Sequence, residues 1–98
     1  MAEVLLLEFD GVGRAEYEAV NQALGLNADT GAGDWPDGLI VHQGGASSNG
    51  WVVVEVWESQ ADQEAFMAQR LGPALQAGGI EGPPTRVEWL GTPSYTIT

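Results

Sequence analysis

WVVVEVWES, residues 51–59, and WPDGLIVHQGG, residues 35–45, are the two segments that decide the fold of this chain. Side chains of a strand point alternately to its two faces, and the first segment is apolar on both of them. The second segment predicts a neighbouring strand, and it carries the only histidine of the chain, His42. A strand that is apolar on both faces belongs in the centre of a sheet that is covered on both sides.

The composition limits both the partners and the chemistry that we expect. Fourteen acidic residues against three arginines and no lysine give a net charge of -11, which opposes binding to nucleic acid and to anionic membranes. The chain has no cysteine for a disulfide or a thiolate metal site, and no lysine for a Schiff base. One histidine cannot form a multi-histidine metal cluster within one chain. We therefore expect no cofactor and no metal and, without a signal peptide or a membrane span, a cytoplasmic protein.

Four segments have the length and composition of strands. They are bounded by turn-forming residues and cover residues 3–9, 39–43, 51–58 and 85–90. The dipeptide Asn49-Gly50 is a strong hairpin signal between the second and the third of them. The tail over residues 94–98 is also β-prone and suited to pairing with a neighbouring edge.

Two helices separate these strands. Apolar residues at helical spacing predict the first helix over residues 14–26. The second helix follows a capping box formed by Ser59 and Asp62, and we expect Gly72-Pro73 to kink or restart it. Residues 27–38 are dense in Gly and Asp and predict a loop.

The order of the elements is β-α-β-β-α-β, which is the ferredoxin-like arrangement of an α+β domain. We expect one domain over residues 1–98, with a four-stranded antiparallel sheet. Its first and third strands are central, and these are the two strands that are apolar on both faces. Two helices cover only one face of the sheet, so a monomer would leave the other apolar face in water. We therefore expect a homodimer in which two such faces pack together.

Several motifs point to a family. They are WPDGLI (residues 35–40), His42, Gly45, Trp51, EVWES (residues 55–59), Phe66 and RLGPAL (residues 70–75). With the element order, they resemble the dimeric α/β-barrel superfamily and, within it, the antibiotic-biosynthesis-monooxygenase-like (ABM-like) group. The resemblance covers nearly the whole chain and implies a dimeric α/β barrel.

The resemblance implies several possible activities. The superfamily includes cofactor-free oxygenases that act on polycyclic phenols, haem-degrading enzymes, polyketide cyclases and lactone isomerases, and the fold alone does not select among them. Haem-degrading members place a haem-ligating histidine near the end of the second helix. Residues 72–79 contain no histidine, so the resemblance does not extend to haem ligation.

His42 and Glu55 are the candidate catalytic residues. Imidazole is the side chain best suited to acid–base work near neutral pH, and a mid-strand position would hold its ring in place. Glu55 lies among the tryptophans of its strand, where a carboxyl group can serve as an acid or a base. Each residue also has a purely structural interpretation. His42 could be packed in the interior with both ring nitrogens hydrogen-bonded, and Glu55 could lie at a sheet edge or pair with an arginine. The hairpin register decides whether the two share a face, because a one-residue slip reverses the answer.

Tyr17, Trp57, Phe66 and Arg70 are the candidate substrate-binding residues. The aromatic rings suit stacking on an aromatic substrate, and Arg70 suits a substrate anion. The alternatives are core packing for the rings and a structural salt bridge for Arg70.

Three functions are compatible with this pattern. The first is a small enzyme without a tightly bound cofactor, which acts on an apolar or aromatic small molecule by monooxygenase-, cyclase- or isomerase-like proton transfer. The second is a non-catalytic small-molecule-binding or regulatory dimer. The third is a structural dimer in which His42 and the tryptophans only pack. We rank them in this order, and a cavity lined by His42 would favour the first two over the third.

Overall fold

A computed structural model describes residues 2–91 and 94 of the chain. Apart from Ser94, the predicted β-prone tail lies outside the described residues. Within residues 2–91, no helix has both the length and the apolar character needed to cross a membrane.

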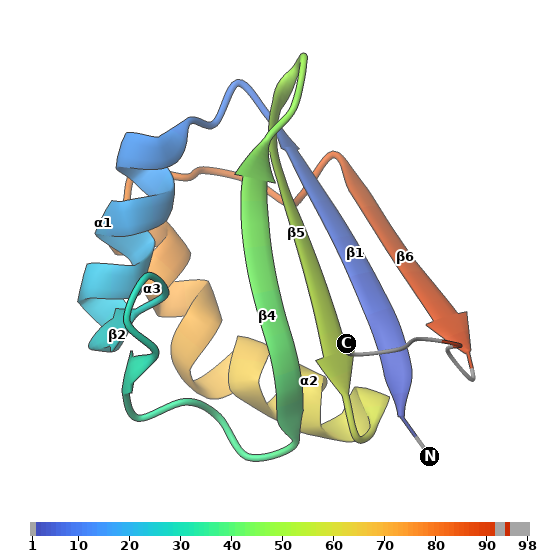
Figure 1. Cartoon of the computed structure of the whole chain (residues 1–98). Helices are drawn as coiled ribbons and strands as arrows, with labels where there is room; N and C mark the ends of the chain where they lie inside the picture. Colours follow the sequence, from blue (N-terminus) through green and yellow to red (C-terminus); the bar gives the residue numbers. More distant parts are fainter. Residues whose placement is uncertain (1, 92–93, 95–98) are drawn as a thin grey trace.

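A four-stranded antiparallel sheet forms one layer of the molecule (Figure 1). The strand order is β4-β5-β1-β6, and the bounds are β1 Glu3–Asp10, β4 Leu39–Ala46, β5 Gly50–Trp57 and β6 Arg86–Gly91. The two central strands, β1 and β5, are the first and third of the four predicted strands, which confirms the predicted α+β topology. β4 runs three residues beyond the predicted strand end because its pairing with β5 continues as far as Ala46.

The helices form the second layer, and Figure 1 shows them on one face of the sheet. They are α1 Arg14–Leu24, α2 Gln60–Phe66, the π-helical turn η1 Met67–Leu71 and α3 Gly72–Ala77. The predicted first helix was two residues too long, because Gly25 takes a left-handed conformation (φ 74°) and ends α1. Leu26–Asn27 instead form the short strand β2, which pairs with β3, Ala32–Gly33, inside the predicted loop.

The second predicted helix is confirmed at its start and at its break. The side chain of Ser59 accepts a hydrogen bond from the backbone N–H of Asp62 at 3.2 Å, as a capping residue does. Before Pro73 the helix widens into the π turn, in which the N–H of Gly72 bonds the carbonyl of Met67. Proline cannot donate a backbone hydrogen bond, so the helix restarts at the point where its ladder is interrupted.

The core lies between the sheet and the helices. Trp57 and Leu5 are its most deeply buried side chains, at 0% and 1% exposure, and both point from the central strands toward the helices. The other buried apolar side chains of this cluster are Leu7, Phe9, Val20, Trp51, Val53, Phe66, Ala74 and Ile80. Trp57 also packs on Phe66, with ring centroids 5.8 Å apart.

The opposite face of the sheet is also rich in apolar side chains. On β1, Val4 and Leu6 lie beside Val56 and Val54 of β5 and face away from the core. Leu90 of the edge strand β6 lies beside Val4 and is 47% exposed. Figure 1 shows none of the described helices on this outer face.

Candidate functional site

A β-bulge places His42 on the inner face of the sheet. Leu39 lies opposite Trp57, but Val41 lies opposite Val56, so one extra residue is accommodated between Leu39 and Val41. The regular register from Val41 onward then sets His42 directly opposite Glu55. Side chains of directly opposed residues share a face, which answers the register question in favour of a shared inner face.

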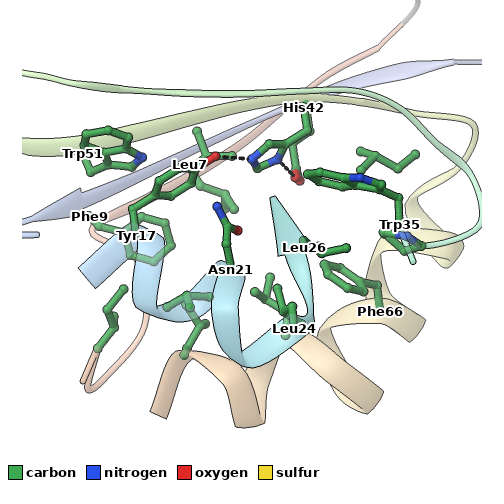
Figure 2. A pocket seen from close by; sticks show the side chains of 18 of the residues that line it. Leu7, Phe9, Tyr17, Asn21, Leu24, Leu26, Trp35, His42, Trp51 and Phe66 are labelled. Carbon is green, nitrogen blue, oxygen red and sulfur yellow. Dashed lines mark hydrogen bonds and ion pairs between the residues drawn. The ribbon is translucent and has the colours of Figure 1, made fainter. Parts of the chain in front are cut away.

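His42 joins Glu55 and Tyr17 in a chain of short polar contacts. Figure 2 shows the ring of His42 turned toward Tyr17, with dashed lines at its contacts. Its Nδ1 lies 2.7 Å from Oε2 of Glu55, and its Nε2 lies 2.5 Å from the hydroxyl of Tyr17 on α1. The second carboxyl oxygen of Glu55 accepts a hydrogen bond from Nε1 of Trp57 at 3.0 Å. The side chains of His42 and Glu55 are only 13% and 7% exposed. The structure therefore brings a base, a carboxylate and a phenol together in the protein interior.

The partners of His42 assign the roles of its two ring nitrogens. A carboxylate only accepts hydrogen bonds, so Nδ1 of His42 donates its N–H to Glu55. Nε2 is then the acceptor, and the phenolic O–H of Tyr17 donates to it. This is the arrangement in which a carboxylate holds an imidazole in one tautomer and leaves the other nitrogen ready to take a proton.

The phenol of Tyr17 is held in its neutral form. Burial raises the pKa of Tyr17 above its ordinary value, a hydrogen bond from Asn21 opposes this rise, and the nearby charge of Glu55 adds to it. The ring of Tyr17 is almost parallel to that of His42, with an angle of 1° between the planes and centroids 5.9 Å apart. Tyr17 therefore reaches His42 as an O–H donor.

A small cavity of about 60 Å³ lies beside these side chains, between the sheet and the helices. Tyr17, Asn21, His42 and Glu55 contribute its polar groups. The rest of the wall is apolar or aromatic and includes Leu7, Phe9, Val12, Val20, Leu24, Leu26, Trp35, Pro36, Leu39, Trp51, Val53, Phe66, Leu71, Leu75 and Ile80. The volume suits a few water-sized groups, whereas sites for small organic molecules usually measure about 300–1,000 Å³.

Trp35 and Trp51 belong to the site although the sequence did not identify them as site residues. The ring of Trp35, from the loop before β4, lies 5.3 Å from that of His42. Trp51 packs on Tyr17 with centroids 4.7 Å apart, and its buried indole N–H has no hydrogen-bond partner among the described residues. Both residues lie in the motifs that carry the family resemblance. Trp35 was expected in a loop and Trp51 in the core, and neither position indicated a role at the site.

Gly44 makes the close packing of this site possible. It faces inward opposite Val53, and a Cβ atom there would lie 2.8 Å from Nε1 of Trp51 and 3.1 Å from Cζ of Tyr17. Any side chain would therefore push Tyr17 away from the strand that carries His42.

The four candidate substrate-binding residues are divided between the cavity and its surroundings. Tyr17 and Phe66 line the cavity. Trp57 lies behind it, fully buried, and hydrogen-bonds Glu55. Arg70 is outside the cavity wall and donates to the backbone carbonyls of Leu24 and Asp34. Across residues 2–91 and 94, no group of three or more His, Cys, Asp or Glu side chains is arranged to hold a metal ion.

Comparisons with known proteins do not assign a family to the chain. No protein-family model matches it, and a search of curated proteins gives no match.

The hydrogen bonds predict the tautomer of His42. In the neutral imidazole, the ¹⁵N chemical shifts should show the proton on Nδ1, because Glu55 accepts it. Glu55→Gln should shift the population toward the Nε2–H tautomer, since an amide also offers a donor. NMR of ¹⁵N-labelled protein gives this result without ambiguity, because the chain has one histidine. Glu58→Gln, at an exposed position, is the control. A dominant Nε2–H form in the wild type would contradict the assignment.

The raised pKa of Tyr17 predicts a loss of stability at alkaline pH. An unfolded chain loses the phenolic proton near pH ~10, whereas the folded state still holds it, so the free energy of unfolding falls as the pH rises through that range. Tyr17→Phe should flatten this dependence. Urea unfolding at about pH 9 and about pH 11 measures it, and the absence of lysine keeps this window nearly free of other titrating side chains. Equal pH dependence in both proteins would show that the phenol is not desolvated.

Proposed function

We propose that this protein is a small enzyme without a tightly bound cofactor, which moves a proton on a neutral apolar or aromatic small molecule. The observation that carries the proposal is the Tyr17–His42–Glu55 chain on the wall of an otherwise apolar cavity. Low polarity around a base and its carboxylate strengthens their interaction and excludes competing water. The resemblance to the ABM-like group is part of this proposal.

His42 is the proposed general base, and Nε2 is the atom that takes the proton. The hydroxyl of Tyr17 occupies Nε2 at rest, so a ligand gains access to the base when that hydroxyl moves aside. Proton uptake would give an imidazolium, which Glu55 stabilises through Nδ1. Trp57 holds Glu55 in position, and Phe66 shapes the apolar wall.

The ligand that fits this site is uncharged. Glu55 is buried, and Arg70 binds carbonyls outside the cavity wall. An anionic ligand would therefore lose its hydration beside a carboxylate without meeting a compensating cation in the cavity wall, which is costly. Non-catalytic binding of the same kind of molecule is the second candidate function. The small cavity favours this function for a small ligand only.

The test of the function separates binding from turnover. A panel of phenolic and polyketide-like compounds is screened by thermal shift, where a ligand at about 100 times its Kd should stabilise the protein by about 2.7 kcal/mol. Conversion of each hit is then followed by mass spectrometry. We expect His42→Ala to retain binding and to lose turnover by about 10²–10⁴-fold, as general-base variants do. Gln76→Ala, at an exposed position of α3 away from both the cavity and the outer face, should behave as the wild type.

Two results would overturn this function. Binding without conversion in the wild type would leave the non-catalytic binding dimer. A panel without any hit, in a protein that His42→Ala destabilises by about 1–3 kcal/mol, would leave the structural dimer, because His42 then only satisfies its buried partners.

A homodimer that forms a dimeric α/β barrel completes the proposal. The outer face of the sheet carries Val4, Leu6 and Val54, and its charged groups are Glu8 and Asp10 at one end of β1 and Arg86 and Glu88 of β6, where Arg86 pairs with both Glu8 and Glu88. The net charge of -11 therefore lies mostly elsewhere, and two copies can approach through this face with little repulsion. A cytoplasmic location, proposed from the composition, is compatible with a chain that has no cysteine.

Leu6→Glu tests the dimer. It places a charge in the middle of the outer face, and burying that charge at an interface should cost about 3 kcal/mol, or more than 100-fold in the dimer dissociation constant. Gln22→Glu adds the same charge on an exposed position of α1 and should leave association unchanged. Sedimentation equilibrium at micromolar concentrations measures both. A wild-type protein that sediments as a monomer would contradict the proposed dimer.

A further inference from the structure

Residues 34–37 form a thin layer between the cavity and the surface of the molecule. Trp35 and Pro36 line the cavity on one side. The same two residues line an open groove of about 280 Å³ on the other side, together with Asp62 and Arg70. Figure 2 shows Trp35 at the side of the site opposite Trp51, close to His42. Phe66 of α2 also borders both spaces. If residues 34–37 moved away from Phe66, the cavity and the groove would join, and their combined space reaches the lower end of the range for small-molecule sites.

Arg70 connects this layer to the helices. Its Nη2 donates to the carbonyl of Asp34 at 2.8 Å and to the carbonyl of Leu24 at 3.3 Å. Its guanidinium also lies over the ring of Phe66, 5.5 Å from the centroid. In the described part of the chain, Arg70 supplies the one side-chain hydrogen bond that reaches residues 34–37 from another element. The π turn that carries Arg70 is an element often found at functional positions.

Glycines with positive φ flank the layer on both sides. Gly33 has φ 116° and Gly38 has φ 85°, so the backbone changes direction just before and just after residues 34–37. The indole N–H of Trp35 bonds the carbonyl of Gly31 within the same loop, at 3.0 Å. Gly31 lies before the Gly33 hinge, so movement of residues 34–37 about Gly33 would break this bond as well as the bond from Arg70 to Asp34.

We infer that residues 34–37 are a hinged cover over His42, that Arg70 is the latch of this cover, and that the groove is the entrance for the ligand. Loops of this kind open at a few residues that absorb the change in backbone angles, and they close the site against water. The groove carries Asp34, Asp37 and Asp62 against one cation, Arg70, so its net negative charge disfavours anions and admits neutral molecules. The inference depends on the proposed function only for the nature of the ligand.

The test measures how easily a reagent reaches His42. Diethyl pyrocarbonate acylates neutral imidazole, and mass spectrometry of the peptide that carries the single histidine gives the rate. Arg70→Met should raise this rate about tenfold, which corresponds to the loss of one charge-assisted hydrogen bond from the closed state. Trp35→Ala should raise it at least as much, because it removes the cover. Arg86→Met removes the same charge at an exposed position of β6 and should leave the rate unchanged.

The acylation rates of these variants either support or overturn the role of Arg70 as a latch. An unchanged rate in Arg70→Met, in a protein that circular dichroism shows to be folded, would overturn the latch even if Trp35→Ala reacts faster. An equal increase in Arg86→Met would overturn it as well, since it would indicate general loosening. If Arg70→Met does not fold, Arg70→Lys replaces it, since lysine keeps the charge but lacks the planar set of donors of arginine. Arg70→Lys should raise the acylation rate by an intermediate amount, and an unchanged rate would overturn the latch. Because the measurement needs no turnover, a failed cover and a failed enzymatic function are distinguishable.

Discussion

The bulged antiparallel pairing of β4 with β5 is the constraint on which the rest of the site depends. Leu39 and His42 are an odd number of positions apart, so in a regular strand one of them would face the helices and the other would face away. The extra residue, Ile40, removes this conflict, and Leu39 and His42 both face inward. His42 then lies opposite Glu55 and within reach of Tyr17 on the first helix. The polar chain across the core is therefore a consequence of backbone geometry.

A buried carboxylate needs hydrogen bonds to remain in a protein interior, and Glu55 obtains them from an imidazole and an indole. The permanent cations are engaged elsewhere: Arg14 and Arg86 pair with surface carboxylates, and Arg70 binds carbonyls. In the described part of the chain, Glu55 thus has no ion pair with an arginine. An imidazole that takes up a proton at this position gains an ionic partner that the neutral ring does not have. This gain is the physical argument behind the proposal that His42 accepts a proton.

Much of the fold could be predicted because the strands and helices differ in apolar periodicity. The apolar pattern of β1 and β5 placed both in the centre of the sheet, and the Ser59 cap and Pro73 marked the start and the break of the second helix. The register could not be predicted, because a bulge leaves no mark in a run such as residues 39–43. For the same reason the pairing of His42 with Glu55 stayed open. Trp35 was missed because loop residues have no apolar periodicity from which their positions could be predicted. The role of Arg70 depends on backbone carbonyls, and the pattern of side chains in a sequence does not show where those carbonyls lie.

The cavity needs a part of its wall that can move, whereas the outer face of the sheet needs a second copy to cover it. Tight packing around Tyr17 and Trp51, which Gly44 permits, brings the phenol to His42 but leaves only about 60 Å³ free. A fold that holds its base so closely admits an organic ligand only if some part of the wall can move. The central strands β5 and β1 are hydrogen-bonded on both sides, which holds their part of the wall in place. Trp35 and Pro36, in residues 34–37, separate the cavity from a surface groove, and this part of the wall belongs to a loop on the helix side. A second copy on the outer face would therefore leave the entrance free, so dimerisation and ligand entry are compatible in one small domain.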